Sequence, residues 1–550
     1  MRVSHKSRRL RWLKALSATL PVLAVMRGHG ADTSGATDPL LDLFIKKGFV
    51  TQQEADQVKA EADYMRTNGA PYAMPPVSKW KISNGIQNIE LYGDLRLRYE
   101  DRTAVDPDGG QIALQRYRYS VRVGLRGDAL DDFYYGFRLE TSSNPRSPWV
   151  TMGTASSVSS SSPAYQGPFG KSTAGINIGQ VYLGWHPEDW VDITLGKMPN
   201  PLYTTPMVWS ANINPEGSAE RFRYTVGQAD FFATFAQFVY QDMNPVDAAQ
   251  NLGINNLLGQ NQENIFQLAW EAGLTYHITD KVSAKMAATI YEYYGLKRST
   301  LNSGSATSPY YGDPYVGEGD YAGPGSGAPY YGNSGYGAAG SLPGYESLNY
   351  PNNQVGLNDL TVLEVPFEVN VKFDHLNARL FGDFAYNLKG AQRAQAASEA
   401  YAAFLEDFAG TGNPATIQTF PPQTHDDKAY QIGVGVGSAD LVTGPSQGLV
   451  YGTSSHKHDW EVRTYWQHIE QYSLDPNLLD TDFMEGDENL QGIYAAVAYA
   501  LSDNFIATFR YGYASRINSQ LGTGGTGQDI PQINPIEHYN ILQVDATFRF

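Results

Sequence analysis

The chain has 550 residues, with 40 basic and 57 acidic residues for a formal net charge of −17, and no cysteine. The lack of cysteine excludes disulfide frameworks, thiolate zinc sites and cysteine nucleophiles, and the acidic balance argues against nucleic-acid binding. No internal apolar run reaches the ~18–20 residues of a membrane-spanning helix, but a membrane-spanning β-barrel would contain no such run.

The N-terminus has the pattern of a secretion signal over residues 1–36. Basic residues from Arg2 to Lys14 precede an apolar stretch, Ala15 to Met26, that is too short to span a membrane. The sequence from Ser34 to Ala36 suits a cleavage site, although Arg27 and His29 interrupt the segment between the apolar stretch and that site. We therefore expect an exported protein.

Residues 37–68 differ in pattern from the rest of the chain. Gly48 suits the end of one short helix, and Thr51 with Glu54 forms a capping box that would open a second. We expect a periplasmic helical hairpin, with three roles left open: a spacer, a trimerising coiled coil, or a contact with the cell wall. Residues 69–87, rich in proline and glycine, are predicted to be a linker.

From residue 88 to residue 550 the apolar residues recur with a period of two, which indicates β-strands with two different environments on their faces. In the last ten residues, one face holds Leu542, Val544, Ala546, Phe548 and Phe550, and the other holds Gln543, Asp545, Thr547 and Arg549. A soluble sandwich and a barrel in lipid both fit this stretch alone.

The arginines of the first two strands favour the barrel. They all fall on one face, and an arginine that faces lipid near the bilayer midplane costs about 2–4 kcal/mol. We therefore expect these side chains to face a polar lumen, either attracting anionic solutes or tied to neighbouring carboxylates that stiffen the wall. The predicted pore-lining residues are Asp94, Arg96, Arg98, Arg116, Arg118, Arg122, Arg126, Arg138, Glu140, Arg221 and Arg223.

Segments of this kind recur to the end of the chain. Sixteen candidate strands begin near residues 88, 116, 132, 176, 189, 219, 230, 264, 281, 359, 376, 428, 457, 491, 504 and 538. Short and long connections alternate between them, and aromatic residues flank the short ones, as in outer-membrane barrels. The connection at 438–456 is too long for this scheme. The sequence predicts an all-β transmembrane barrel of sixteen antiparallel strands behind the helical hairpin.

The loops offer three candidate features. Residues 197–219 follow the fifth strand and contain four prolines, so we expect them to fold inward as a constriction with Tyr203, Trp209 and Glu216, the alternative being an external loop. The acidic stretch 475–489 is expected to be a solvated loop, with shared divalent cations as the alternative. The Gly- and Tyr-rich stretch 302–350 is expected to be an irregular external loop.

The opening "LYGDLRLRYE…RYRYSVRVGLRG", the segment "GQVYLGWHPEDWVDITLGKMPNP" and the terminal "FRF" resemble the "putative porin" family of Gram-negative outer membranes. Alginate-export and phosphate-selective channels share the alternating arginines more distantly. The resemblance implies a barrel through which small solutes diffuse, often as a trimer, and a terminal phenylalanine that resembles the signal read by the barrel-assembly machinery.

The sequence therefore predicts an outer-membrane porin for passive diffusion of small hydrophilic solutes, with a tether from outer membrane to cell wall through residues 38–68 as the alternative. We expect no enzyme activity, no cofactor and no metal: His456, His458 and His468 are candidate metal ligands, but no acidic partner stands at an obvious spacing. The expected partners are outer-membrane lipid, lipopolysaccharide and two further copies of the chain.

Overall fold

The computed structural model describes residues 46–47, 51, 85–107, 109–129, 132–142, 144–153, 175–241, 265–294, 360–395, 426–438, 448–453, 456–523 and 535–550. The chain divides into two compact units, residues 1–76 and 77–550. The expected signal peptide, nearly all of the hairpin and linker, and the 302–350 loop lie outside the described residues. Within the described residues, no helix has the length and apolar character needed to cross a membrane.

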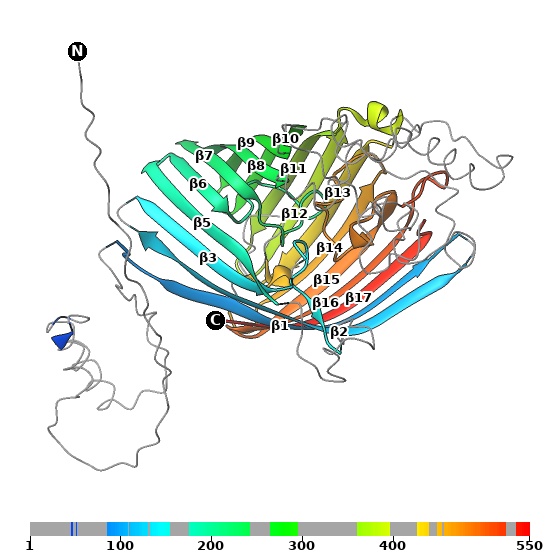
Figure 1. Cartoon of the computed structure of the whole chain (residues 1–550), viewed down its shortest axis with the longest axis horizontal. Coiled ribbons are helices and arrows are strands. Elements are labelled where there is room, and N and C mark those ends of the chain that lie inside the picture. The colour runs from blue at the N-terminus through cyan, green and yellow to red at the C-terminus, as the bar shows by residue number, and fades with distance from the viewer. Residues whose placement is uncertain are drawn as a thin grey trace, which may run out of the picture. The chain divides into compact units, whose positions relative to one another are not determined.

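The described part of the second unit is built almost entirely of strands (Figure 1). The strands are β1 (Glu90–Val105), β2 (Gln111–Ala129), β3 (Phe133–Thr141), β4 (Val150–Thr151), β5 (Ile176–Glu188), β6 (Val191–Lys197), β7 (Glu216–Val226), β8 (Ala229–Gln241), β9 (Ile265–Thr279), β10 (Val282–Tyr294), β11 (Thr361–Lys372), β12 (Asn377–Asn387), β13 (Lys428–Gly437), β14 (Trp460–Ile469), β15 (Leu490–Ser502), β16 (Phe505–Arg516) and β17 (His538–Arg549).

Each long strand pairs antiparallel with its sequence neighbours, and the sheet closes where β1 pairs with both β2 and β17. The two-residue β4 only flanks β2, so the barrel wall has sixteen strands and the predicted fold is confirmed. Every predicted strand start lies within five residues of the observed one. The largest difference is at β2, which begins at Gln111, five residues before the start at residue 116 that its arginines indicated.

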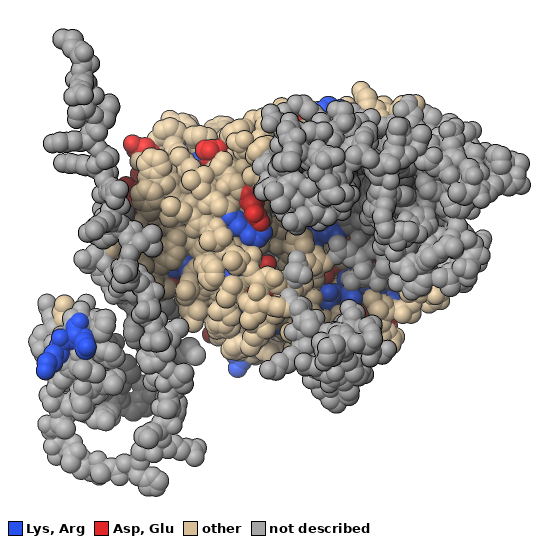
Figure 2. Space-filling model, viewed as in Figure 1, with Lys and Arg blue, Asp and Glu red and all other residues tan. Residues whose placement is uncertain are grey.

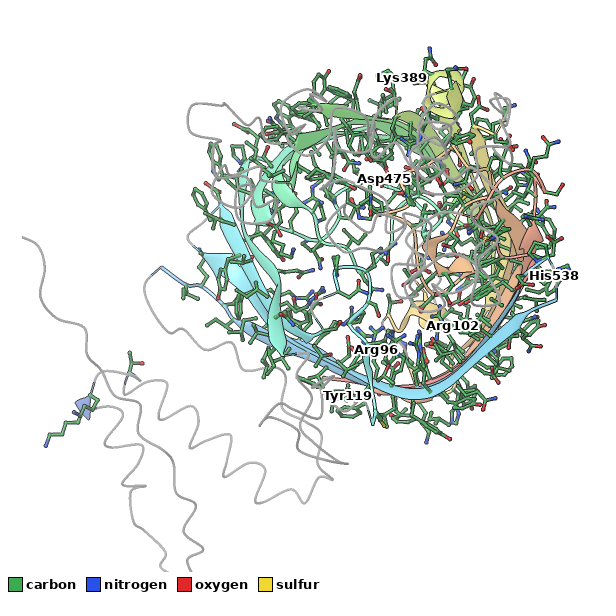
Figure 3. All side chains as sticks on the ribbon, turned by 45° about the vertical axis from the view of Figure 1, so that its right-hand side comes forward. Arg96, Arg102, Tyr119, Lys389, Asp475 and His538 are labelled. Atoms are coloured by element: carbon green, nitrogen blue, oxygen red, sulfur yellow. The ribbon has the colours of Figure 1, made fainter. Side chains whose placement is uncertain are left out.

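Alternation places apolar side chains outside and polar side chains inside. On β17, Val544 and Phe548 are 45% and 43% exposed, whereas Gln543 and Asp545 are 0% and 4% exposed. The described surface in Figure 2 is accordingly mostly uncharged. In Figure 3, Arg96 and Arg102 lie on the inner side of the wall and Tyr119 on its outer side. An exposed apolar band around a polar interior is the reverse of a soluble fold and is typical of a barrel in lipid.

The C-terminal residue belongs to the seam of the barrel. The backbone N–H of Phe550 donates to the carbonyl of Gly93 at 3.1 Å, and the N–H of Gly93 donates to Phe550 at 3.0 Å. The ring of Phe550 also covers Gly93 so closely that a Cβ there would lie 2.6 Å from it. The terminal phenylalanine therefore completes the pairing of the last strand with the first.

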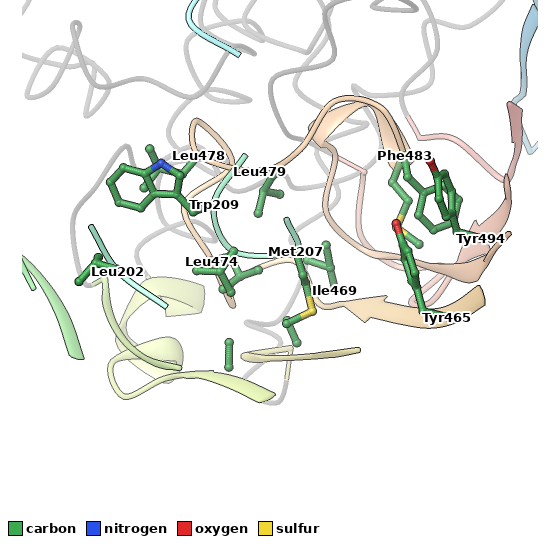
Figure 4. Packing of buried hydrophobic residues seen from close by; sticks show 14 of the residues in the cluster. Leu202, Met207, Trp209, Tyr465, Ile469, Leu474, Leu478, Leu479, Phe483 and Tyr494 are labelled. Carbon is green, nitrogen blue, oxygen red and sulfur yellow. The ribbon is translucent and has the colours of Figure 1, made fainter. Parts of the chain in front are cut away.

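Two long loops lie inside the barrel: loop A (residues 198–215, between β6 and β7) and loop B (residues 470–489, between β14 and β15). They are joined by the backbone, because Ser210 N–H donates to Leu478 O at 2.6 Å and Asp480 N–H donates to Pro206 O at 3.2 Å. They also contribute to a buried apolar cluster (Figure 4). Its labelled members are Leu202, Met207, Trp209, Tyr465, Ile469, Leu474, Leu478, Leu479, Phe483 and Tyr494.

The connection between β13 and β14 lies where the alternation of short and long connections predicts a short turn, yet it is long. Its described residues 448–453, here called segment C, fold back into the lumen, where Leu449 and Val450 are each 1% exposed. Arg510 on β16 donates to the carbonyl of Val450 at 2.7 Å, and the N–H of Val450 donates to Glu461 on β14 at 3.0 Å. This connection is longer than its counterparts because it fills part of the interior.

Candidate functional site

The register of β1 and β2 places three of the arginines on β2 directly opposite acidic residues of β1, whereas Arg98 lies opposite Arg118. Glu100 lies opposite Arg116, Asp94 opposite Arg122 and Glu90 opposite Arg126. Since Cβ directions alternate along a strand, one correctly assigned arginine fixes the face of the others. The two strands thus place acidic and basic side chains side by side in the lumen.

Glu100 is the centre of the buried part of this network. Its side chain is fully enclosed, and it accepts hydrogen bonds from Arg116 Nε at 2.7 Å, Arg102 Nη2 at 3.0 Å and Gln543 Nε2 at 2.8 Å. Arg118 Nη1 lies 3.5 Å from the same carboxylate. These arginines have a structural partner, so the scaffold alternative describes this part of the face.

Arg98 connects the wall to loop B. Its Nε donates to Asp545 on β17 at 2.7 Å, its Nη1 donates to Asp482 of loop B at 2.6 Å, and its guanidinium lies 4.1 Å from the centre of the Trp149 ring. Arg510 of β16 also donates to Asp545. Asp482 is 384 residues from Arg98 in sequence, which is why the pattern of the first strands did not reveal it.

The arginines nearer the short-turn rim have looser pairing. Arg96 and Arg122 share Asp94, at 2.8 Å and 3.0 Å. Arg138 lies 3.0 Å from Glu140, Arg126 lies 2.7 Å from Glu90 in an exposed pair, and Arg221 is paired with Asp192 of β6. Arg223 and Arg549 line the lumen without an ion pair to any described residue.

Loop A lies against three buried carboxylates of the opposite wall. The backbone N–H of Tyr203 donates to Glu271 at 2.7 Å, the hydroxyl of Thr204 donates to Glu364 at 2.7 Å, and the hydroxyl of Thr205 donates to Asp383. These acids stand on β9, β11 and β12, which carry no arginine pattern that would have drawn attention to them. Each of these acids falls on the polar face of a strand whose apolar residues recur with a period of two. That alternation was the signal in the sequence that the acids face the lumen.

The three residues expected in the constriction do not stay together. Tyr203 and Trp209 are buried in loop A, and Lys285 Nζ lies 3.9 Å from the centre of the Tyr203 ring. Glu216 instead is the first residue of β7 and pairs with Lys197 at 2.6 Å. Its side chain is 62% exposed on the outer face, because β7 begins three residues earlier than predicted. Glu216 is thus not part of the constriction.

The acidic stretch of loop B is not a solvated loop, contrary to expectation. Asp475 accepts hydrogen bonds from Tyr293 at 2.8 Å and Tyr240 at 3.0 Å, and Figure 3 shows it inside the ring of strands. Glu485 pairs with Arg102 and accepts from Tyr539 at 2.8 Å. The loop folds inward because the wall supplies cations and hydroxyl donors for carboxylates that would otherwise be costly to bury.

The candidate metal-ligand histidines have separate partners. His458 Nδ1 lies 2.7 Å from the Tyr499 hydroxyl, and His468 lies beside Gln491 and Glu470 at 3.1 Å and 3.3 Å. Within the described part of the chain, no group of three or more His, Cys, Asp or Glu has a metal-binding arrangement.

Two cavities lie in the lumen, on the short-turn side of loop A. The first, about 790 Å³, is bounded by loop A and strands β7 to β10, and the second, about 390 Å³, by β1 to β3, loop A, loop B and segment C. Ala211 of loop A borders both. The charged lining residues are Arg221, Arg223, Lys285, Asp230 and Glu271 in the first and Arg96, Arg98, Arg122, Arg126, Arg138, Arg510, Arg549, Glu90, Asp94, Asp480 and Asp482 in the second.

Comparison with known proteins gives one family. The family described as "Putative porin" matches residues 109–550, and no curated protein matches the chain. Among solved structures, OmpF of Salmonella typhi in complex with daunomycin aligns at 9% identity and a TM-score of 0.38, covering 85% of this chain and 99% of that one. An anion-selective porin from Comamonas acidovorans aligns at 9% identity and a TM-score of 0.37, covering 84% and 99%.

Proposed function

Because the chain belongs to the outer-membrane family of putative porins, we propose that it forms a passive diffusion pore with a preference for small anions. The charge of the two cavities supports the preference. Their lining holds ten basic and six acidic side chains, although the whole chain is acidic. A channel of this family and fold acts by conduction rather than by catalysis.

The charges that line the lumen determine ion selectivity more than the net charge of the chain does. Charges in water are screened beyond about 8–10 Å at physiological salt, so distant loops contribute little to the field in the lumen. Side chains on a narrow wall of low dielectric act at shorter range and raise the local concentration of counter-ions. The surplus of basic groups therefore favours anions on the short-turn side of loop A.

The paired arginines and the unpaired ones have different roles in this proposal. Arg116 and Arg118, held around Glu100, stabilise the wall. Arg223 and Arg549, which have no ion-pair partner among the described residues, supply the surplus charge. Loops A and B narrow the lumen between the two rims of the barrel. We assign the rim with the short turns to the periplasm.

The test is the reversal potential of single channels in planar bilayers across a tenfold KCl gradient. We expect anion selectivity in the unmodified protein and a shift toward cations in the variant Arg223→Gln with Arg549→Gln. Lys281→Gln is the matched control, because Lys281 is an exposed rim cation paired with Asp374 at 2.8 Å and lines neither cavity. Cation selectivity of the unmodified pore, or equal shifts in both variants, would contradict the proposal.

A further inference from the structure

A row of inward-facing side chains crosses the first cavity from β7 to β10, strands that lie side by side in the wall (Figure 1). Arg223 of β7 lies directly opposite Phe232 of β8, and Phe232 lies directly opposite Gly273 of β9. Lys285 of β10 follows, with its Nζ 4.9 Å from the centre of the Phe232 ring. The row therefore places an aromatic ring between two cations.

The ring of Phe232 lies along the wall because its neighbour on β9 has no side chain. A Cβ at Gly273 would clash with the tip of the ring, so only glycine allows the ring to extend across β9 toward Lys285. The ring of Tyr203 in loop A meets the Phe232 ring edge-on, with centres 6.3 Å apart and planes at 81°. Phe232 remains only partly buried, so its ring is accessible from the cavity.

Neither cation of the row forms an ion pair with a described residue. The Nζ of Lys285 lies instead 3.9 Å from the centre of the Tyr203 ring. The acid directly opposite Lys285 on β11 is Glu368, and this carboxylate is paired with Arg379 at 2.6 Å. Arg223 has an exposed side chain that lines the same cavity. Both cations are therefore available to an anion in the cavity.

The other charged groups of the first cavity are already engaged. Glu271 is buried and accepts hydrogen bonds from the backbone of loop A and from threonine hydroxyls of the wall. Asp230 accepts a hydrogen bond from Thr225 at 2.7 Å, and Arg221 is paired with Asp192. The positive charge without a partner is thus concentrated at the two ends of the row, on either side of the ring.

We propose that this row binds small aromatic carboxylates as they pass loop A. The ring of such a solute packs on Phe232 in an offset or edge-on arrangement, and its carboxylate accepts hydrogen bonds from Arg223 or Lys285. A cationic solute would meet two like charges, and the ammonium of Lys285 already occupies the aromatic faces that attract cations. The proposal rests on the diffusion pore proposed above and adds a class of solute to it.

The size of the cavity is compatible with such a solute. An apolar cavity of about 150 Å³ is enough to hold benzene, and the first cavity measures about 790 Å³. A single-ring acid therefore fits together with water, and it leaves room for solutes to move past loop A. The row acts as a weak binding site along the route rather than as a plug.

The experiment compares three probes in single-channel recordings in KCl: benzoate, cyclohexanecarboxylate and benzamide. Cyclohexanecarboxylate has the charge and similar size without an aromatic face, and benzamide has the ring without the charge. We expect benzoate to halve the conductance at a concentration about two- to tenfold lower than cyclohexanecarboxylate does, and benzamide to act more weakly than either. Equal action of benzoate and cyclohexanecarboxylate, or of benzoate and benzamide, overturns the proposal.

Three variants assign the effect to the row. Phe232→Leu should remove the preference for benzoate over cyclohexanecarboxylate, whereas Phe232→Tyr keeps an aromatic face and should retain it. Lys285→Gln should weaken both carboxylates alike, by about tenfold, because it removes charge and leaves the ring. Phe235→Leu is the matched control, since Phe235 is on the same strand but 36% exposed on the outer face. A preference that survives in Phe232→Leu, or that is lost equally in Phe235→Leu, contradicts the assignment.

Isothermal titration calorimetry of the refolded protein in detergent repeats the comparison without requiring conduction. A protein that prefers benzoate in the calorimeter and loses the preference in Phe232→Leu supports the binding site even if no channel opens, and the proposed pore alone then fails. A conducting, anion-selective pore that binds the three probes equally overturns the binding site and leaves the proposed function intact.

Discussion

Replacing Glu100→Gln should strongly destabilise the barrel. Glu100 is fully enclosed and receives hydrogen bonds from Arg102, Arg116 and Gln543. Removing one partner of a buried ion pair costs about 3–5 kcal/mol, because the remaining charge stays buried without compensation. At 1.4 kcal/mol per tenfold change, that lowers the folded-to-unfolded ratio by about a hundred- to several thousand-fold.

The measurement is equilibrium unfolding in denaturant, in detergent micelles or vesicles, followed by tryptophan fluorescence and by heat-modifiable gel migration. Glu90→Gln is the matched control. Glu90 pairs with Arg126 at 2.7 Å, but the side chains are 47% and 53% exposed, so its loss should cost at most about 1 kcal/mol. The double variant Glu100→Gln with Arg116→Gln should recover part of the loss, because it removes one of the uncompensated charges. Equal effects of Glu100→Gln and Glu90→Gln would refute the reasoning.

Two further predictions concern the seam and loop B. Gly93→Ala should destabilise the barrel by about 1–3 kcal/mol and reduce the yield of inserted protein, because the new Cβ meets Phe550 and a backbone oxygen; Gly435→Ala, whose nearest atoms are 3.9 Å away, should be tolerated in the same unfolding assay. Burial and the adjacent charge of Asp482 raise the pKa of Asp480 to about 7. Lowering the pH from 8 to 6 therefore neutralises a lumen carboxylate and should increase anion preference in reversal-potential measurements, whereas Asp480→Asn should show the pH 6 value throughout.

Much of the wall could be predicted because a membrane strand obeys a local rule. A period of two with lipid on one side fixes both the face and the approximate start of each strand, so the inward direction of Arg98 or Arg118 requires no knowledge of distant residues.

The position and prolines of loop A predicted that it folds inward, but only the tertiary structure decided which residues of the loops and the wall meet in the lumen. Loops A and B have no periodicity, so nothing local indicated that Asp482 would reach Arg98 or that Thr204 would bond to Glu364. Acidic residues of a loop look solvated in sequence, and they become buried only where the fold brings cations and hydroxyl donors to them. Closure of the barrel does this, because it joins β1 to β17 and places side chains more than four hundred residues apart, such as Arg98 and Asp545, in one network.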